Sequence, residues 1–283
     1  MPIFSPLIWT CWAALLGLIV GSFLNVVILR LPRRMEAQWR QEAQRCLELP
    51  TDAELPPGIV RKASHCPHCQ HPLGVRDNIP LLSWLMLRGR CRYCQAPISI
   101  QYPLVELAAA LVGGITVIHT GANLHALAAM GLGWALLTLA VIDIRTQLLP
   151  DAITLPLLWA GLLLSLWPFG PAPADAVIGA AIGYLSLWSV YWLFRLLTGK
   201  EGMGHGDFKL LAALGAWMGA GALLPIILLS SLVGAVVGIG LILSRRQQQG
   251  VPMAFGPFLA AAGWLWLITG QQLAPLWLRW LQP

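Results

Sequence analysis

Two aspartates at the ends of long apolar segments are the residues of this chain best suited to chemistry. Asp143 closes one such segment, and Asp207 opens another after a glycine-rich turn over residues 202–206. An ionisable side chain beside membrane-depth apolar sequence is costly and marks a functional site by default. Two carboxyl groups held close together share a proton, so one activates water while the other donates a proton. The pair is a candidate for aspartic peptide hydrolysis.

Other interpretations of these acids remain open in the sequence. Asp207 could cap the N-terminus of a helix, with Gly206 easing the turn. Glycines such as Gly202, Gly204 and Gly206 permit a positive φ or a close approach to other groups. Each acid could also pair with a nearby cation, Arg145 or Lys209. The spacing disfavours those pairs, because residues i and i+2 of a helix do not face one another.

Two further acids lie near the predicted site. Asp151 follows Pro150, and we interpret it as a helix N-cap after a proline turn. Glu106 lies near the start of the second apolar segment, where it is a weaker candidate for chemistry and a candidate support for the polar region before it.

Four cysteines form two Cys-x-x-Cys pairs separated by twenty-one residues. Two such pairs can complete a closed tetrahedral site for one zinc ion. Four thiolates leave no open coordination position, which predicts a structural metal. Disulfides are the competing interpretation, but a basic region facing a reducing cytoplasm disfavours them. The predicted ligands are Cys66, Cys69, Cys91 and Cys94, and His65, His68 and His71 lie close enough in sequence to replace one of them.

The composition identifies a polytopic α-helical membrane protein. Of 283 residues, 57% are hydrophobic and only 11% are charged, and the mean hydropathy is +0.70. Soluble chains carry about 25% charged residues. The fourteen tryptophans suit a protein anchored at two membrane interfaces. We expect about eight transmembrane helices, over residues 7–29, 102–119, 124–143, 152–168, 175–197, 208–219, 221–243 and 255–270.

One polar region interrupts the apolar segments. Residues 30–100 hold eleven of the eighteen Lys and Arg residues. The positive-inside rule places this region in the cytoplasm, and no aromatic–basic pattern of a nucleic-acid-binding module is present. We therefore predict a first transmembrane helix (1–29), a cytoplasmic zinc domain (30–101) and a multi-span domain (102–283). This topology puts Asp143 and Asp207 on the cytoplasmic side.

Taken together, these motifs resemble the type IV prepilin peptidases, the bifunctional leader peptidases and N-methyltransferases of bacterial pilus and type II secretion systems. The matching stretches span nearly the whole chain: Gly21-Ser22-Phe23-Leu24-Asn25-Val26-Val27, the two cysteine pairs, Tyr102-Pro103-Leu104-Val105-Glu106, Asp143 with Leu149-Pro150-Asp151, and Gly202 to Leu210. Presenilin-type proteases share the glycine–acid signature, but the cysteine region points to the bacterial family.

The resemblance implies more than the residues do. It implies that Asp143 and Asp207 are the catalytic pair and that the cysteine region belongs to methyl transfer. The substrates would be prepilins and pseudopilins, cut after a short basic leader and then methylated at the new N-terminal residue with S-adenosylmethionine. Gly89 is a guess for methyl transfer, and Gly204, Gly206, Lys209, Asp151 and Glu106 are expected to support the site. The location would be the bacterial inner membrane, among lipids.

Two other function classes remain alternatives. In a transporter the acids would relay protons, although no internal repeats are evident. In a scaffold of the secretion machinery the zinc domain would be purely structural. Neither His-Glu-x-x-His nor Gly-x-Ser-x-Gly occurs, which argues against zincins and serine hydrolases of those types. Leader recognition by Glu106, Asp151 or Glu201 is a further hypothesis.

Overall fold

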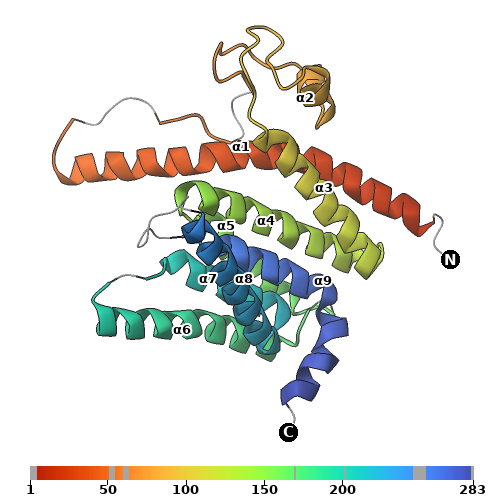
Figure 1. The fold of residues 1–283 in the computed structure, drawn as a ribbon, viewed down its shortest axis with the longest axis vertical. Helices are drawn as coiled ribbons and strands as arrows, with labels where there is room; N and C mark the ends of the chain where they lie inside the picture. Colours follow the sequence, from red (N-terminus) through yellow and green to blue (C-terminus); the bar gives the residue numbers. More distant parts are fainter. Residues whose placement is uncertain are drawn as a thin grey trace. The chain divides into compact units, whose positions relative to one another are not determined.

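The described part of the chain is helical, as the sequence predicts. The computed structural model describes residues 5–50, 55–59, 64–168, 170–200, 202–244 and 253–281, and every regular element in these ranges is a helix (Figure 1). Glu201, one of the proposed leader-binding acids, lies outside the described residues. The chain divides into two compact units, Met1–Ala122 and Asn123–Pro283. The expected boundaries at residues 29 and 101 remain predictions.

Helices α1 (Pro6–Cys46) and α3 (Gln101–Thr120) form the frame of the first unit. They approach so closely at Gly21 that a Cβ there would lie 2.7 Å from the Cα of Glu106. The Asn25 amide, buried between the helices, donates a hydrogen bond of 3.1 Å to the carbonyl oxygen of Tyr102. The motif around Gly21 and Asn25 therefore packs one helix on the other, as small and amide residues do in membranes.

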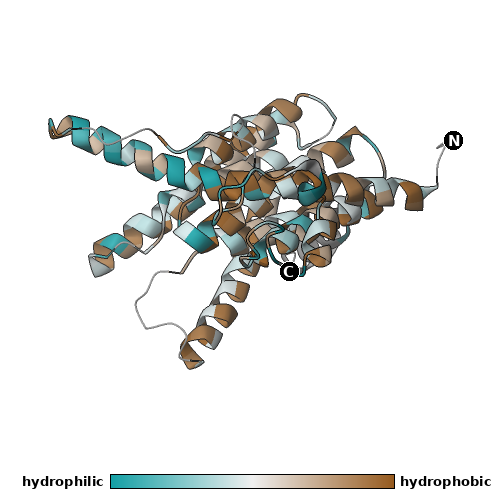
Figure 2. Cartoon of the chain, turned by 90° about the horizontal axis from the view of Figure 1, so that it is seen from above, coloured by the Kyte–Doolittle hydropathy of each residue, from teal (hydrophilic) through white to brown (hydrophobic). Residues whose placement is uncertain are grey.

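Helix α1 continues well beyond the end that the hydropathy pattern predicted. The apolar segment was expected to close at residue 29, but the helix runs to Cys46 with Pro32 inside it. In Figure 2, α1 changes from hydrophobic residues near the N-terminus to hydrophilic residues at its far end. Hydropathy reports where a helix leaves the apolar environment and not where its backbone hydrogen bonding stops, which explains the difference.

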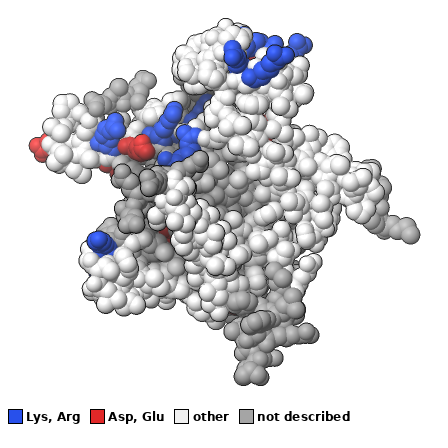
Figure 3. All heavy atoms as spheres, viewed as in Figure 1, with Lys and Arg blue, Asp and Glu red and all other residues white. Residues whose placement is uncertain are grey.

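Between α1 and α3 lies the cysteine region, mostly turns with two short helices. These are η1 (Val75–Asn78) and α2 (Leu82–Met86). Isolated β-bridges, His65 with Pro72 and Arg90 with Pro97, close a loop around each cysteine pair. Lys and Arg side chains gather over this region in the space-filling view (Figure 3).

The second unit is built around α7 (His205–Met218), a short helix that is buried along most of its length. It packs against α5 (Asp151–Leu164), α6 (Pro173–Thr198) and α9 (Gly256–Leu281). Gly179 of α6 and Gly215 of α7 bring two backbones together with no room for a Cβ on either. The unit also contains α4 (Leu124–Thr146), η2 (Ala220–Ala222) and α8 (Leu223–Leu243).

The eight expected apolar segments correspond to helices α1 and α3–α9. Five of these are long and apolar enough to cross a membrane. Helices α5 and α7 are short, with 14 residues each, and the apolar part of α9 is Gly256–Gly270. Exposed large apolar side chains along α6 and α8 suit contact with lipid. The chain is thus a multi-pass membrane protein.

The close approach of α1 and α3 predicts that Gly21→Ala destabilises the first unit. The added methyl group must displace the backbone of α3, and such overpacking costs about 1–3 kcal/mol. Thermal unfolding in detergent measures this effect. Gly114→Ala, at the same interface but with 3.7 Å to its nearest neighbour, is the matched control. An equal melting temperature for both variants would contradict the prediction.

Candidate active site and metal centre

Asp143 lies in the last turn of α4, where it is buried. The helix ends at Gln147, whose left-handed conformation (φ 54°) lets its N–H bond to the carbonyl oxygen of Asp143 at 2.8 Å. The side chain points elsewhere: its Oδ2 accepts a 2.9 Å hydrogen bond from the backbone N–H of Gly256. The carboxyl group is thus held by a donor from the start of α9.

Asp207 is the third residue of α7 and is also buried. The N-cap of α7 is Gly204, and no side chain caps this end of the helix. Asp207 is therefore not the N-cap residue, although its carboxyl group contacts the backbone N–H of Gly204. Its Oδ1 is buried and has no hydrogen-bond partner among the described residues. A buried polar atom without a partner is rare and calls for an explanation.

The fold brings the two acids together. Asp143 lies close enough to Asp207 for their charges to interact, and Leu149, in the connection between α4 and α5, lies beside both. A Cβ on Gly206, next to Asp207, would come within 2.7 Å of Leu149, and one on Gly256, which bonds to Asp143, within 3.1 Å. Two acids 64 positions apart in sequence (207 − 143) thus share one neighbourhood.

The glycine turn works by close approach and not by unusual dihedral angles. Gly204 has φ −78° and Gly206 lies within α7, so the expectation of a positive φ was wrong for these two glycines. Gly202 packs against the ring of Phe194, where a Cβ would lie at 2.8 Å. Gly204 has ordinary space. Two of the three glycines therefore allow neighbouring side chains to contact the backbone.

Lys209 pairs with Asp151 and not with Asp207. Its Nζ lies 2.7 Å from both carboxylate oxygens of Asp151, which joins the start of α5 to α7. The N-cap of α5 is Pro150, and no side chain caps it, so the capping interpretation of Asp151 was wrong. This half-exposed ion pair fixes the rim of the site.

The four predicted cysteines converge on one point. Their sulfur atoms all lie within 4.8 Å of one another, and Cys66 Sγ lies 3.8 Å from Cys94 Sγ. Ligands at about 2.3 Å around a tetrahedral zinc ion are themselves about 3.8 Å apart. Backbone N–H groups of Cys94 and Tyr93 lower the pKa of Cys91, which favours a thiolate there. The Ala96 N–H acts in the same direction on Cys94, but burial and the neighbouring thiols outweigh it and raise the pKa of Cys94. The cluster has the chemistry and the dimensions of a metal site, and it contains no histidine among the described residues.

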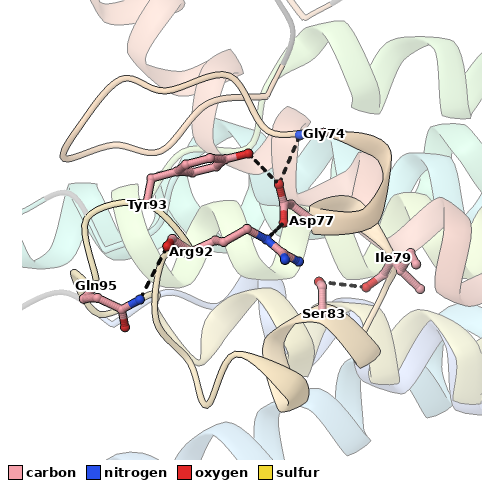
Figure 4. Close-up of polar contacts among 7 residues, drawn as sticks. All are labelled: Gly74, Asp77, Ile79, Ser83, Arg92, Tyr93 and Gln95. Carbon is pink, nitrogen blue, oxygen red and sulfur yellow. Dashed lines mark hydrogen bonds and ion pairs between the residues drawn. The ribbon is translucent and has the colours of Figure 1, made fainter.

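Asp77, which the sequence analysis did not single out, joins the two cysteine loops (Figure 4). Its carboxylate accepts a 2.7 Å hydrogen bond from Nε of Arg92, and contacts from the Tyr93 hydroxyl and the Gly74 N–H. The hydrogen bond from Arg92 holds the pKa of Asp77 below its usual value. Beside it lies an open surface hollow of about 350 Å³, lined by Gly74, Arg76, Asp77, Arg92 and Tyr93.

Gly89 and Glu106 also have clear structural settings. Gly89 has φ 68°, and a Cβ there would lie 2.9 Å from the ring of Trp84, so its turn requires glycine for packing. Glu106 is buried on α3 and accepts a 2.8 Å hydrogen bond from the backbone N–H of Leu81. This bond ties the cysteine region to α3.

Comparison with known proteins gives the family. The model of the bacterial peptidase A24 N-terminal domain matches residues 15–120, and that of the type IV leader peptidase family matches residues 130–239. Prepilin leader peptidase/N-methyltransferases from Stutzerimonas stutzeri and Aeromonas hydrophila are 50% and 54% identical, over 97% and 95% of this chain and 96% and 93% of their own. The chain belongs to the type IV leader peptidase family.

The resemblance inferred from the motifs is thereby confirmed. A further member of the family, the prepilin leader peptidase/N-methyltransferase of Pseudomonas aeruginosa, is 50% identical over 97% of this chain. No solved structure matches the chain. The two family models divide the sequence close to residue 122, where the structure divides it.

The bond between Glu106 and Leu81 predicts a change in local stability. Glu106→Ala removes the acceptor, and a hydrogen bond to a charged group contributes about 1.5–3 kcal/mol. Amide exchange at Leu81 should therefore accelerate about tenfold or more in hydrogen–deuterium exchange. Glu106→Gln retains an acceptor oxygen and is the control. Unchanged exchange in the alanine variant would show that this contact does not hold the loop.

Proposed function

We propose that this chain is a membrane aspartic endopeptidase that removes the leader of prepilins and pseudopilins, and that it then methylates the new N-terminal residue. The observation that carries the peptidase is the buried pair of acids, Asp143 and Asp207, of which one lacks a partner for a carboxyl oxygen. The names of the relatives, prepilin leader peptidase/N-methyltransferase, support the substrate and the second activity.

The pair suits peptide hydrolysis without further cofactors. One carboxylate removes a proton from water as that water attacks the scissile carbonyl carbon. The other acid protonates the carbonyl oxygen and stabilises the tetrahedral intermediate. A non-polar surrounding strengthens both interactions, and the neighbours Ile142 and Phe208 are fully buried.

The location of the pair suits a membrane-anchored substrate. Asp143 ends one helix and Asp207 begins another, so both lie at helix ends. We assign this side to the cytoplasm of a bacterial inner membrane, because Arg145, Lys200 and Lys209 lie near the same ends. A prepilin with an apolar helix and a basic leader would present its scissile bond at that depth.

Loss of either acid should abolish cleavage. We expect Asp143→Asn and Asp207→Asn each to reduce cleavage of a prepilin at least about 100-fold, since acid–base groups contribute 10²–10⁴-fold. Melting temperature checks folding. Asp175→Asn, whose Oδ1 accepts an N–H from Ala220, is the control with a retained acceptor. Full cleavage by both site variants would contradict the assignment of the two acids as the catalytic pair.

The cysteine region fits the second activity. Cys66, Cys69, Cys91 and Cys94 would hold one zinc ion, whose closed coordination supplies a covalent cross-link between the two loops. The adjoining hollow presents the guanidinium group of Arg76, that of Arg92, which also bonds to Asp77, and the ring of Tyr93. These groups suit a carboxylate and an aromatic base, the two ends of S-adenosylmethionine, which supplies an electrophilic methyl group when bound.

Zinc removal should act on methyl transfer and leave cleavage in place. Cys91→Ser is expected to lose the zinc ion and to weaken binding of S-adenosylhomocysteine about tenfold or more, because Arg92 and Tyr93 lie between two ligands. Metal analysis and calorimetry measure these effects. Cys46→Ser changes an exposed cysteine outside the cluster and is the control. Zinc loss with unchanged ligand binding would contradict the assignment of the hollow.

A further inference from the structure

A backbone amide from the start of α9 contacts one of the two acids. The N–H of Gly256 donates to Oδ2 of Asp143 at 2.9 Å in a buried environment. First-turn N–H groups of a helix have no acceptor within the helix. In this turn Pro257 has no N–H, and the following two N–H groups both donate to the carbonyl oxygen of Phe255. Of the N–H groups at the start of α9, that of Gly256 has no backbone acceptor in the helix, and it donates to the carboxyl group of Asp143.

The contact leaves no space for a side chain at residue 256. A Cβ there would lie 2.6 Å from Oδ2 of Asp143 and 3.1 Å from Cδ2 of Leu149. Leu149 cannot simply move away, because its other side faces Gly206, where a Cβ would meet it at 2.7 Å. Any larger residue at position 256 therefore has to displace the Asp143 carboxyl group.

We propose that Gly256 is a positioning residue that holds Asp143 as the ionised member of the pair, so that Asp143 is the base and Asp207 the proton donor. This assignment rests on the proposed peptidase function. An N–H donor at a helix N-terminus stabilises a carboxylate. Asp207 also lies in a first helical turn, that of α7, and its carboxyl group contacts the Gly204 N–H, so the two acids differ at the second oxygen of Asp207. Oδ1 of Asp207 is buried without a partner, and a neutral carboxyl group is far less costly than a charged one in that situation.

The assignment gives a balanced reaction. Asp143 takes a proton from water, and the water oxygen bonds to the scissile carbonyl carbon. Asp207 gives its proton to the carbonyl oxygen, which forms a tetrahedral diol. When the carbon–nitrogen bond breaks, Asp143 passes its proton to the leaving amine, and a diol hydroxyl returns a proton to Asp207. Both acids end in their starting states.

The first experiment is Gly256→Ala in the full-length protein in detergent, with a prepilin as substrate. We expect kcat to fall about 100-fold, the effect of misplacing a catalytic group by about 1 Å. KM should stay within about twofold, because Gly256 orients an acid and does not bind the leader. The control is Gly240→Ala, whose added Cβ would meet open space, and zinc content and melting temperature check the fold. Unchanged kcat would overturn the proposal.

The second experiment removes the donor without adding a side chain. Semisynthesis can replace the peptide N–H of residue 256 by an ester oxygen. Because the carboxylate form alone uses this donor, the acid limb of the pH profile of kcat should move to higher pH by about one unit or more. A shift of the basic limb would reverse the two roles, and no shift would overturn the role of Gly256. If Asp143→Asn and Asp207→Asn still cleave, the proposed function fails instead.

Discussion

The burial of two carboxyl groups in one packed unit is the constraint on which the second half of the structure depends. Ionised groups are costly to remove from water unless hydrogen bonds or partners compensate them. Asp143 receives such compensation from the Gly256 N–H, while Asp207 keeps one oxygen without a partner. Fully buried side chains of Ile142 and Phe208 flank the acids. This arrangement maintains a difference between two chemically identical groups.

The lengths and contacts of the surrounding helices place the two acids in this arrangement. Helix α7 is short and central, so its first turn can carry Asp207 into the interior. Leu149 fills the space between Gly206 and Gly256, and a side chain on either glycine would push it. The ion pair of Lys209 and Asp151 ties α7 to α5 at the more exposed rim. The contacts of Gly206 and Gly256 with Leu149 thus bring together the starts of α7 and α9 and the connection that follows α4.

In the first unit, carboxylates have a different use. Glu106 accepts a hydrogen bond from the N–H of Leu81, and Asp77 accepts hydrogen bonds from Arg92 and from the Gly74 N–H. Both connect parts of the cysteine region that lack regular secondary structure. With few apolar groups in such loops, the four clustered cysteines and charged hydrogen bonds connect segments that a hydrophobic core would otherwise hold. Acids of the first unit therefore connect segments of the chain, as Asp151 also does in the second unit, whereas Asp143 and Asp207 are the pair proposed for chemistry.

Local sequence determined much of this protein. Apolar segments predict helices reliably, because a membrane leaves backbone groups no other way to form hydrogen bonds. The two Cys-x-x-Cys pairs converge because each pair is already shaped by a short turn. Asp143 and Asp207 were also identifiable, since an acid at the end of an apolar segment is unusual in any fold. The end of α1 could not be predicted in this way, because its last residues are polar and a change in hydropathy does not mark where a helix ends.

The tertiary structure decided which groups meet. Asp143 and Gly256 are 113 residues apart, and Asp151 and Lys209 are 58 apart. In the sequence, Gly256 is a glycine before Pro257, and a proline there indicates the start of a helix but not a contact with Asp143. Likewise Asp77 is one acid among several in a polar region until Arg92 folds against it. Composition and spacing report local conformation, whereas a hydrogen bond between distant segments depends on how whole helices pack, and that information is not local to any stretch of the chain.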